Sequence, residues 1–135
     1  MKIISAILES FGYRIKSTQR PFTRWGLEEG LEFVRELGDG VHDQGWGVGM
    51  TGSVLLEGES GDDLDVIVYP LDASKHPDKD LVRGVLVAMG CRMLFTCAAV
   101  QRHWRGKGST DIKFVEKWAY KRDGRRQMVD VFFLS

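Results

Sequence analysis

The sequence predicts an α+β domain in which a mixed β-sheet carries helices on one face and ends in a β-hairpin. Three observations lead to this prediction. Residues 26–37 place apolar side chains at helical spacing, whereas residues 64–69 form a short apolar run of strand length. Residues 112–121 and 125–134 contain many β-branched and aromatic side chains and flank the dipeptide Asp123-Gly124. That dipeptide is a strong hairpin signal, because both of its residues accept the positive φ angles of a two-residue turn.

The first half of the chain is expected to contain two helices, one strand and a turn. Residues 2–11, like residues 26–37, carry apolar side chains at helical spacing, and Gly38 and Gly40 are expected to stop the second of these helices. Residues 46–51 are expected to form a strand whose glycines allow other groups to approach the backbone closely. Residues 53–61 are expected to form a turn that can include one helical turn, since glycines give this segment conformational freedom.

The second half is expected to alternate strands and helices before the terminal hairpin. Residues 64–69 form the most regular predicted strand of the chain. Residues 78–89 begin with acidic side chains and end before Gly90, which are common signs of a helix start and a helix end. Residues 92–97 are expected to form a strand, and residues 98–104 a short helix.

Length and composition indicate a single domain covering residues 1–135. A chain of 135 residues can bury one core but is too short for two domains. Its 43% apolar and 28% charged residues are ordinary for a globular protein, and no stretch reaches the length of a membrane span. Cys91 and Cys97 are too few for a disulfide framework and match no zinc pattern. We therefore expect a cytoplasmic protein with no signal peptide and no membrane partner.

The charges are unevenly distributed although the formal net charge is zero. Residues 27–65 contain eleven Asp or Glu and one Arg, a balance of −10. Residues 101–126 contain nine Lys or Arg against three Asp or Glu, a balance of +6. An acidic half that holds metal and a basic half that holds phosphates would suit phosphoryl-transfer chemistry. Two oppositely charged solvated faces remain an equally good interpretation.

The most informative feature is a pair of aspartates at the start of the best predicted strand. Side chains alternate along a strand, so Asp63 and Asp65 point to the same face, roughly 7 Å apart along the chain. Leu64, Val66 and Val68 take the opposite face and can fill a core. Two carboxylates on one face repel each other unless a cation lies between them. A hard divalent cation with oxygen ligands, most often Mg²⁺, meets that need.

This arrangement resembles the signature of the polymerase-β-like nucleotidyltransferase superfamily. In that signature a Gly-Ser or Gly-Gly ends one strand, an acidic-apolar-acidic triplet follows on the next strand, and a later strand supplies a third carboxylate. Here Gly52 and Ser53 lie ten residues before the triplet that contains Asp63 and Asp65. Asp130, in the last predicted strand, is the candidate third carboxylate.

The resemblance covers about residues 46–70 and the last strand, and it implies both a fold and an activity. It implies a nucleotidyltransferase-like domain that transfers a nucleoside monophosphate from an NTP, such as ATP, to an RNA, a protein or a small hydroxylated acceptor. It also implies Mg²⁺ or Mn²⁺ as cofactor, with Asp63 and Asp65 binding both of two ions. Asp130 would bind the ion that activates the acceptor hydroxyl and would take the proton of that hydroxyl.

The resemblance also implies groups that hold the triphosphate. Gly52 would allow backbone N–H groups to approach the phosphates, and the Ser53 hydroxyl would donate to the terminal phosphates. Basic side chains would neutralise the phosphate charge, although a solvated surface position is the favoured interpretation for each one taken singly. The candidates are Arg102, Arg105, Lys107, Lys113 and Lys117. Two acidic residues, Glu57 and Glu59, depart from the family pattern because they would repel a triphosphate.

The sequence leaves three functions open. The first is the nucleotidyltransferase; the second is a catalytically inactive protein of the same fold that binds a nucleotide, a nucleic acid or a regulatory protein through the basic half. A small metal-dependent phosphohydrolase is the third. A homodimer or a partner protein could complete the site. The metal-dependent functions among these depend on one structural expectation. The last strand must lie beside residues 64–69, so that three carboxylates come together.

Overall fold

The structure, a computed structural model, describes residues 23–60, 63–96 and 112–134, and its centre is a five-stranded mixed sheet. The strand order is β2-β4-β7-β6-β5, in which β4 and β7 run parallel and the other neighbours run antiparallel. The strands are β2 (Trp46–Thr51), β4 (Asp63–Pro70), β5 (Cys91–Thr96), β6 (Ile112–Arg122) and β7 (Arg125–Leu134). This arrangement confirms the predicted fold class and places the last strand directly beside the strand that bears the two aspartates.

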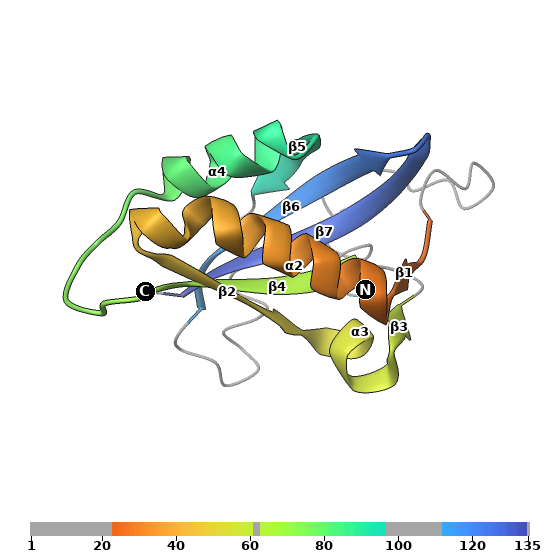
Figure 1. The fold of residues 1–135 in the computed structure, drawn as a ribbon, viewed down its shortest axis with the longest axis horizontal. Helices are drawn as coiled ribbons and strands as arrows, with labels where there is room; N and C mark the ends of the chain where they lie inside the picture. Colours follow the sequence, from red (N-terminus) through yellow and green to blue (C-terminus); the bar gives the residue numbers. More distant parts are fainter. Residues whose placement is uncertain (1–22, 61–62, 97–111, 135) are drawn as a thin grey trace.

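Two helices, α2 (Leu27–Val41) and α4 (Lys79–Ala88), cover one face of this sheet (Figure 1). Each helix buries only part of its apolar stripe: the C-terminal part of α2 and two residues of α4 are in the core, whereas Leu27 and Leu31 of α2 are exposed. Leu64, Val66 and Val68 of β4 are fully buried in the same core. The side chain of Asp78 caps α4 by accepting a hydrogen bond of 2.8 Å from the Asp80 backbone N–H. The core therefore lies between the helices and one face of the sheet, and the alternate side chains of β4 project from the other face.

The α2 helix is longer than the sequence predicted. It continues past Leu37 to Val41, although Gly38 and Gly40 were expected to stop it. A side chain on Gly40 would collide with Val85 of α4. The glycine is therefore retained inside the helix because it allows the two helices to approach closely, and packing outweighs its poor helix propensity.

The terminal hairpin of β6 and β7 forms as predicted. Asp123 and Gly124 have φ angles of 51° and 75°, which are the positive values that a two-residue turn of this kind requires. Arg122 and Arg125 pair across the turn, and the antiparallel register continues to the far end of the strands, with one irregularity near Ile112. The hairpin therefore fixes which residues of β6 lie opposite the residues of β7.

The segment between β2 and β4 is more regular than the turn that was expected. It forms a short helix, α3 (Gly52–Glu57), followed by β3 (Glu59–Ser60), which pairs with β1 (Trp25–Gly26) in a small second sheet. A 3-10 turn, η2 (His42–Gln44), links α2 to β2. The helices predicted for residues 2–11 and 98–104 lie outside the described residues. Among the residues that are described, no helix is both long and apolar enough to cross a membrane.

Candidate metal centre

Three carboxylates meet on the face of the sheet opposite α2 and α4. Asp63 and Asp65 project from β4, and Asp130 of β7 lies directly beside Asp65 in the parallel register. One oxygen from each of the three side chains lies within 4.8 Å of the others. All three residues are buried, with Asp130 fully so. The structure thus confirms the expected convergence of these three aspartates, which we call the carboxylate cluster.

The register explains why these side chains share one place. Thr51 of β2 pairs with Asp65, Asp65 pairs with Asp130, and Asp130 pairs with Lys117 of β6. These residues form one row across four adjacent strands, and side chains in such a row point to the same face. Asp63 joins the cluster from two positions earlier on β4. The row therefore brings together residues that are far apart in the sequence.

Lys117 lies beside the carboxylate cluster, in a position that the sequence analysis did not expect. Its side chain is only 6% exposed, so the solvated position expected for it is wrong. The Lys117 Nζ donates to Asp63 Oδ2 at 2.8 Å and to Asp130 Oδ1 at 3.0 Å. A buried ammonium needs such partners, because an unpaired charge in the interior is very unfavourable. Lys117 is therefore a buried ion-pair partner of the carboxylate cluster.

Two oxygens of the cluster have no hydrogen-bond donor among the described residues. Within the part of the chain that the structure describes, neither Asp65 Oδ1 nor Asp130 Oδ2 receives a hydrogen bond, and both are buried. Leaving a buried acceptor unsatisfied costs about 1–3 kcal/mol, and more for a charged group. Three carboxylates also exceed the single charge of Lys117. The free oxygens and the excess negative charge suit a hard divalent cation such as Mg²⁺ or Mn²⁺.

The aspartates differ in how readily they ionise. Burial and the neighbouring Asp63 charge raise the pKa of Asp65 to about 7. Burial, again with the Asp63 charge, raises the pKa of Asp130 well above its usual value. Burial alone would also raise the pKa of Asp63, but the Lys117 ammonium and a hydrogen bond with Asp130 lower it overall. Without a metal ion, the cluster therefore holds protons near neutral pH, and a cation would displace them.

Gly52 lies against this cluster, at the first position of α3. Its φ angle is +77°, and a side chain at this position would overlap the Asp65 carboxylate. Only glycine meets both requirements, because it accepts positive φ and has no side chain. Ser53 follows as a half-buried residue of α3. The sequence element Gly52-Ser53 is therefore adjacent to the carboxylate cluster, as its spacing suggested.

The other basic residues proposed for phosphate binding are not placed by the structure. Arg102, Arg105 and Lys107 lie outside the described residues, and Lys113 lies in β6, where its side chain is not described. Of the two acidic residues that depart from the family pattern, Glu57 is exposed at the end of α3, and Glu59 lies 3.5 Å from the Arg24 guanidinium.

The hairpin arginines show that the acidic and basic halves of the sequence partly neutralise each other. Arg122 pairs with Glu32 of α2 at 3.3 Å, and Arg125 pairs with Glu29 at 3.1 Å. These ion pairs are at least partly exposed, so each contributes little to stability. Their geometry nevertheless means that these two arginines face acidic residues of the chain itself.

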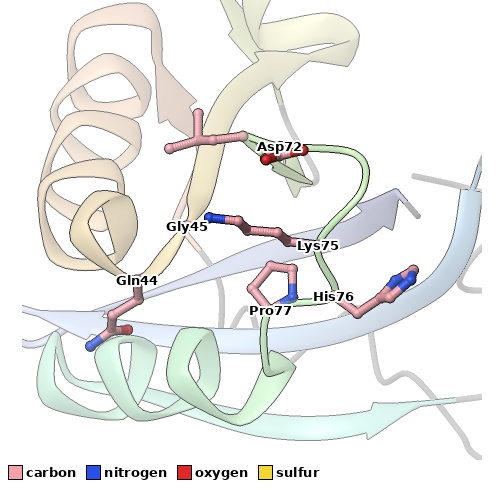
Figure 2. A pocket seen from close by; sticks show the side chains of 7 residues that line it. Gln44, Gly45, Asp72, Lys75, His76 and Pro77 are labelled. Atoms are coloured by element: carbon pink, nitrogen blue, oxygen red, sulfur yellow. The ribbon is translucent and has the colours of Figure 1, made fainter.

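A shallow cleft of about 370 Å³ lies at the opposite end of β4 from the carboxylate cluster (Figure 2). It forms where the chain enters β2 and leaves β4, between Gly45 and the loop that follows Pro70. Its lining residues are Gln44, Gly45, Leu71, Asp72, Lys75, His76 and Pro77. Because Asp63 and Pro70 occupy the two ends of one extended strand, roughly 20 Å or more separates this cleft from the cluster.

Comparisons with known proteins support the fold. No protein-family model matches the chain, and no curated protein matches it. A crystal structure of the Cid1 poly(U) polymerase with Mg and 3′-dATP bound is similar to this chain, with a TM-score of 0.51 and 13% sequence identity. The similarity covers 98% of this chain but only 37% of the polymerase chain. The chain thus has a nucleotidyltransferase-like fold and spans little more than a third of that polymerase.

Proposed function

We propose that this protein is a metal-dependent nucleotidyltransferase. It would transfer a nucleoside monophosphate from an NTP to an RNA, a protein or a small hydroxylated acceptor. The convergence of Asp63, Asp65 and Asp130 on a nucleotidyltransferase-like fold is the observation that carries this proposal. The two buried oxygens that receive no hydrogen bond from the described residues support it further, because a divalent cation could bind them.

The chemistry is an in-line displacement at phosphorus. The acceptor oxygen forms a bond to the α-phosphorus, the bond from that phosphorus to the bridging oxygen breaks, and pyrophosphate leaves. Divalent metal, when bound, supplies positive charge at the phosphate oxygens and the acceptor hydroxyl. Asp63, Asp65 and Asp130 would hold that metal, and Asp130 would also take the proton that the acceptor hydroxyl loses.

The triphosphate would lie beside the start of α3. Gly52 supports this position, because its lack of a side chain lets the Asp65 carboxylate lie directly against the backbone at the start of α3. Ser53 would donate its hydroxyl proton to a phosphate oxygen. Arg102, Arg105 and Lys113 are the proposed sources of positive charge for the outer phosphates. The acceptor would be held by a second copy of the chain or by a partner protein.

The direct test is nucleotide transfer in solution. The protein is incubated with each labelled NTP, Mg²⁺ or Mn²⁺, and RNA, protein or small hydroxylated acceptors, and released pyrophosphate and labelled acceptor are measured. Asp65→Asn and Asp130→Asn are expected to abolish transfer. Asp39→Asn, an exposed aspartate on α2, is the matched control and should leave transfer unchanged. Transfer that persists in both cluster variants would defeat the assignment of these aspartates.

A catalytically inactive nucleotide-binding or regulatory protein of the same fold is the second candidate. The Lys117 ion pairs favour it, because an ammonium already satisfies oxygens of Asp63 and Asp130. Titration calorimetry with a non-hydrolysable NTP, combined with the pyrophosphate measurement, separates the two candidates. A protein that binds the analogue but releases no pyrophosphate from any NTP, with any acceptor, belongs to the second class.

A further inference from the structure

We infer that Lys117 is a built-in cation that takes the place of one metal ion, so that the carboxylate cluster binds a single divalent ion between Asp65 and Asp130. This inference rests on the proposal that the cluster is a metal centre. It departs from the two-ion arrangement that the family resemblance implies. It assigns a role to a buried lysine that nucleotidyl transfer, as derived above, does not use.

The hydrogen bonds divide the oxygens of the cluster into two sets. Lys117 Nζ binds Asp63 Oδ2 at 2.8 Å and Asp130 Oδ1 at 3.0 Å. Asp65 Oδ1 and Asp130 Oδ2 receive no hydrogen bond from the described residues. Asp130 therefore stands between two cation positions, with one oxygen bound to the ammonium and the other free. Asp130 is also the direct neighbour of Asp65 in the sheet register, and the two residues offer carboxylate oxygens within 4.8 Å of each other.

The position of Lys117 is fixed by the fold. It lies opposite Asp130 in the β6–β7 hairpin, and its side chain is 6% exposed. Leaving the cluster would strip a buried ammonium of both carboxylate partners, which is unfavourable. A second divalent ion at the Asp63 and Asp130 oxygens would meet a like charge at hydrogen-bond distance from its ligands. The ammonium thus excludes the second ion and leaves room for one.

The experiment measures how many Mn²⁺ ions bind per chain, with the metal alone and no nucleotide present. Titration calorimetry gives the stoichiometry and affinity, and electron paramagnetic resonance detects two ions that lie close together. The wild-type chain is expected to bind one ion. Lys117→Met, which keeps an unbranched side chain of similar size but removes its charge, is expected to bind two ions, the first roughly tenfold more tightly than wild type does. Lys121→Met, an exposed lysine of the same strand, is the matched control and should bind one ion like wild type.

A double variant guards against misfolding of Lys117→Met. Asp63→Asn combined with Lys117→Met removes both charges of the ion pair and keeps the two free oxygens. It is expected to bind one ion, because Asp65 and Asp130 remain. Circular dichroism establishes whether each variant is folded. If Lys117→Met is unfolded, the number of Mn²⁺ ions bound by wild type and by the double variant tests the inference.

Four outcomes overturn the inference. Two coupled ions in wild type would show that Lys117 excludes nothing, while the proposed transferase would stand. A single ion bound with unchanged affinity by folded Lys117→Met would also show that Lys117 excludes no second ion, and it would leave the proposed transferase intact. No ion in the folded double variant would show that Asp65 and Asp130 do not form the site. No ion in any of these proteins would defeat both this inference and the proposed metal-dependent function.

Discussion

Asp65→Asn should stabilise the metal-free protein at neutral and alkaline pH, although it alters the centre of the candidate site. The wild-type carboxyl is buried beside the negative charge of Asp63, and these effects raise its pKa to about 7 from an ordinary value of 3.8. Asparagine has nearly the same shape as a protonated aspartic acid and cannot ionise. The substitution therefore removes the titration while it keeps the packing.

The sign and the size follow from the difference between the folded and unfolded pKa values. The folded state binds this proton more tightly, so the stability linked to it is fully present below pH 3.8 and is lost as the pH rises through about 7. The interval from 3.8 to about 7, at about 1.4 kcal/mol per pH unit, corresponds to roughly 4 kcal/mol. Asp65→Asn does not lose this stability. Its free energy of unfolding, relative to that of wild type, should therefore increase by that amount as the pH rises over this interval.

The assay is urea unfolding followed by tryptophan fluorescence, with EDTA present, at pH values from 4 to 8. The free energy of unfolding of Asp65→Asn minus that of wild type should rise by about 1.4 kcal/mol per pH unit and level off above pH 7. Asp39→Asn, whose side chain is exposed, serves as the control and should show no such rise. A flat difference across this range would refute the reasoning, because it would mean that the Asp65 carboxylate is stabilised as fully as in water.

Three further predictions concern the ion pair, the glycine and the metal. Lys117→Met should lower the free energy of unfolding by about 3–5 kcal/mol, because the charge of Asp63 loses a buried partner, whereas Lys121→Met should change it by less than about 0.5 kcal/mol. Urea unfolding at pH 7 measures both, and equal effects would contradict the buried pair. Gly52→Ala should destabilise the protein by about 1–3 kcal/mol, because the φ of Gly52 is positive and the new methyl group would overlap a carboxylate of the cluster. Gly84→Ala, on an open helical surface, is the control and should stabilise the protein by about 0.5–1 kcal/mol. Thermal unfolding ranks these two variants, and a stable Gly52→Ala would contradict the close approach. Mn²⁺ at a hundred times its dissociation constant should stabilise wild type by about 2.7 kcal/mol, and EDTA should reverse this. The affinity should rise with pH, because binding displaces protons from the aspartates, and calorimetric affinities that do not change between pH 6 and pH 8 would contradict this.

Much of the fold could be predicted from the sequence because local signals agreed with the packing. The alternation of β4 separated its core side chains from its aspartates, and the Asp123-Gly124 turn defined the hairpin. The convergence of Asp130 with the β4 aspartates needed one further step, the pairing of β4 with β7. The sequence analysis stated that pairing as the expectation on which a three-carboxylate site depends, and the structure confirms it.

The errors arose where tertiary contacts outweigh local preference. Gly40 was expected to end a helix, but the close packing of α2 against α4 keeps it helical. Lys117 was considered either as a phosphate-binding residue or as a solvated surface cation, whereas the structure buries it, which is rare for a lysine. The register of the hairpin could have corrected this: Arg122 and Arg125 flank the turn, and five residues further along each strand are Lys117 and Asp130. The contact between Lys117 and Asp63, which lies two strands away, could not be predicted from the sequence pattern.

The composition of this row of the sheet is itself an argument for function. The positions around it hold buried apolar side chains, such as Phe132 on the same face of β7 and Val131 on the other. Replacing a buried ion pair by apolar residues of similar volume is often neutral or stabilising, so the sheet does not need Asp63, Asp130 and Lys117 in order to fold. Asp65 adds a fourth ionisable group whose pKa of about 7 makes its charge unfavourable in the absence of a metal ion. Such a local conflict between sequence and stability is expected at functional sites, and here a divalent cation at the free oxygens would resolve it.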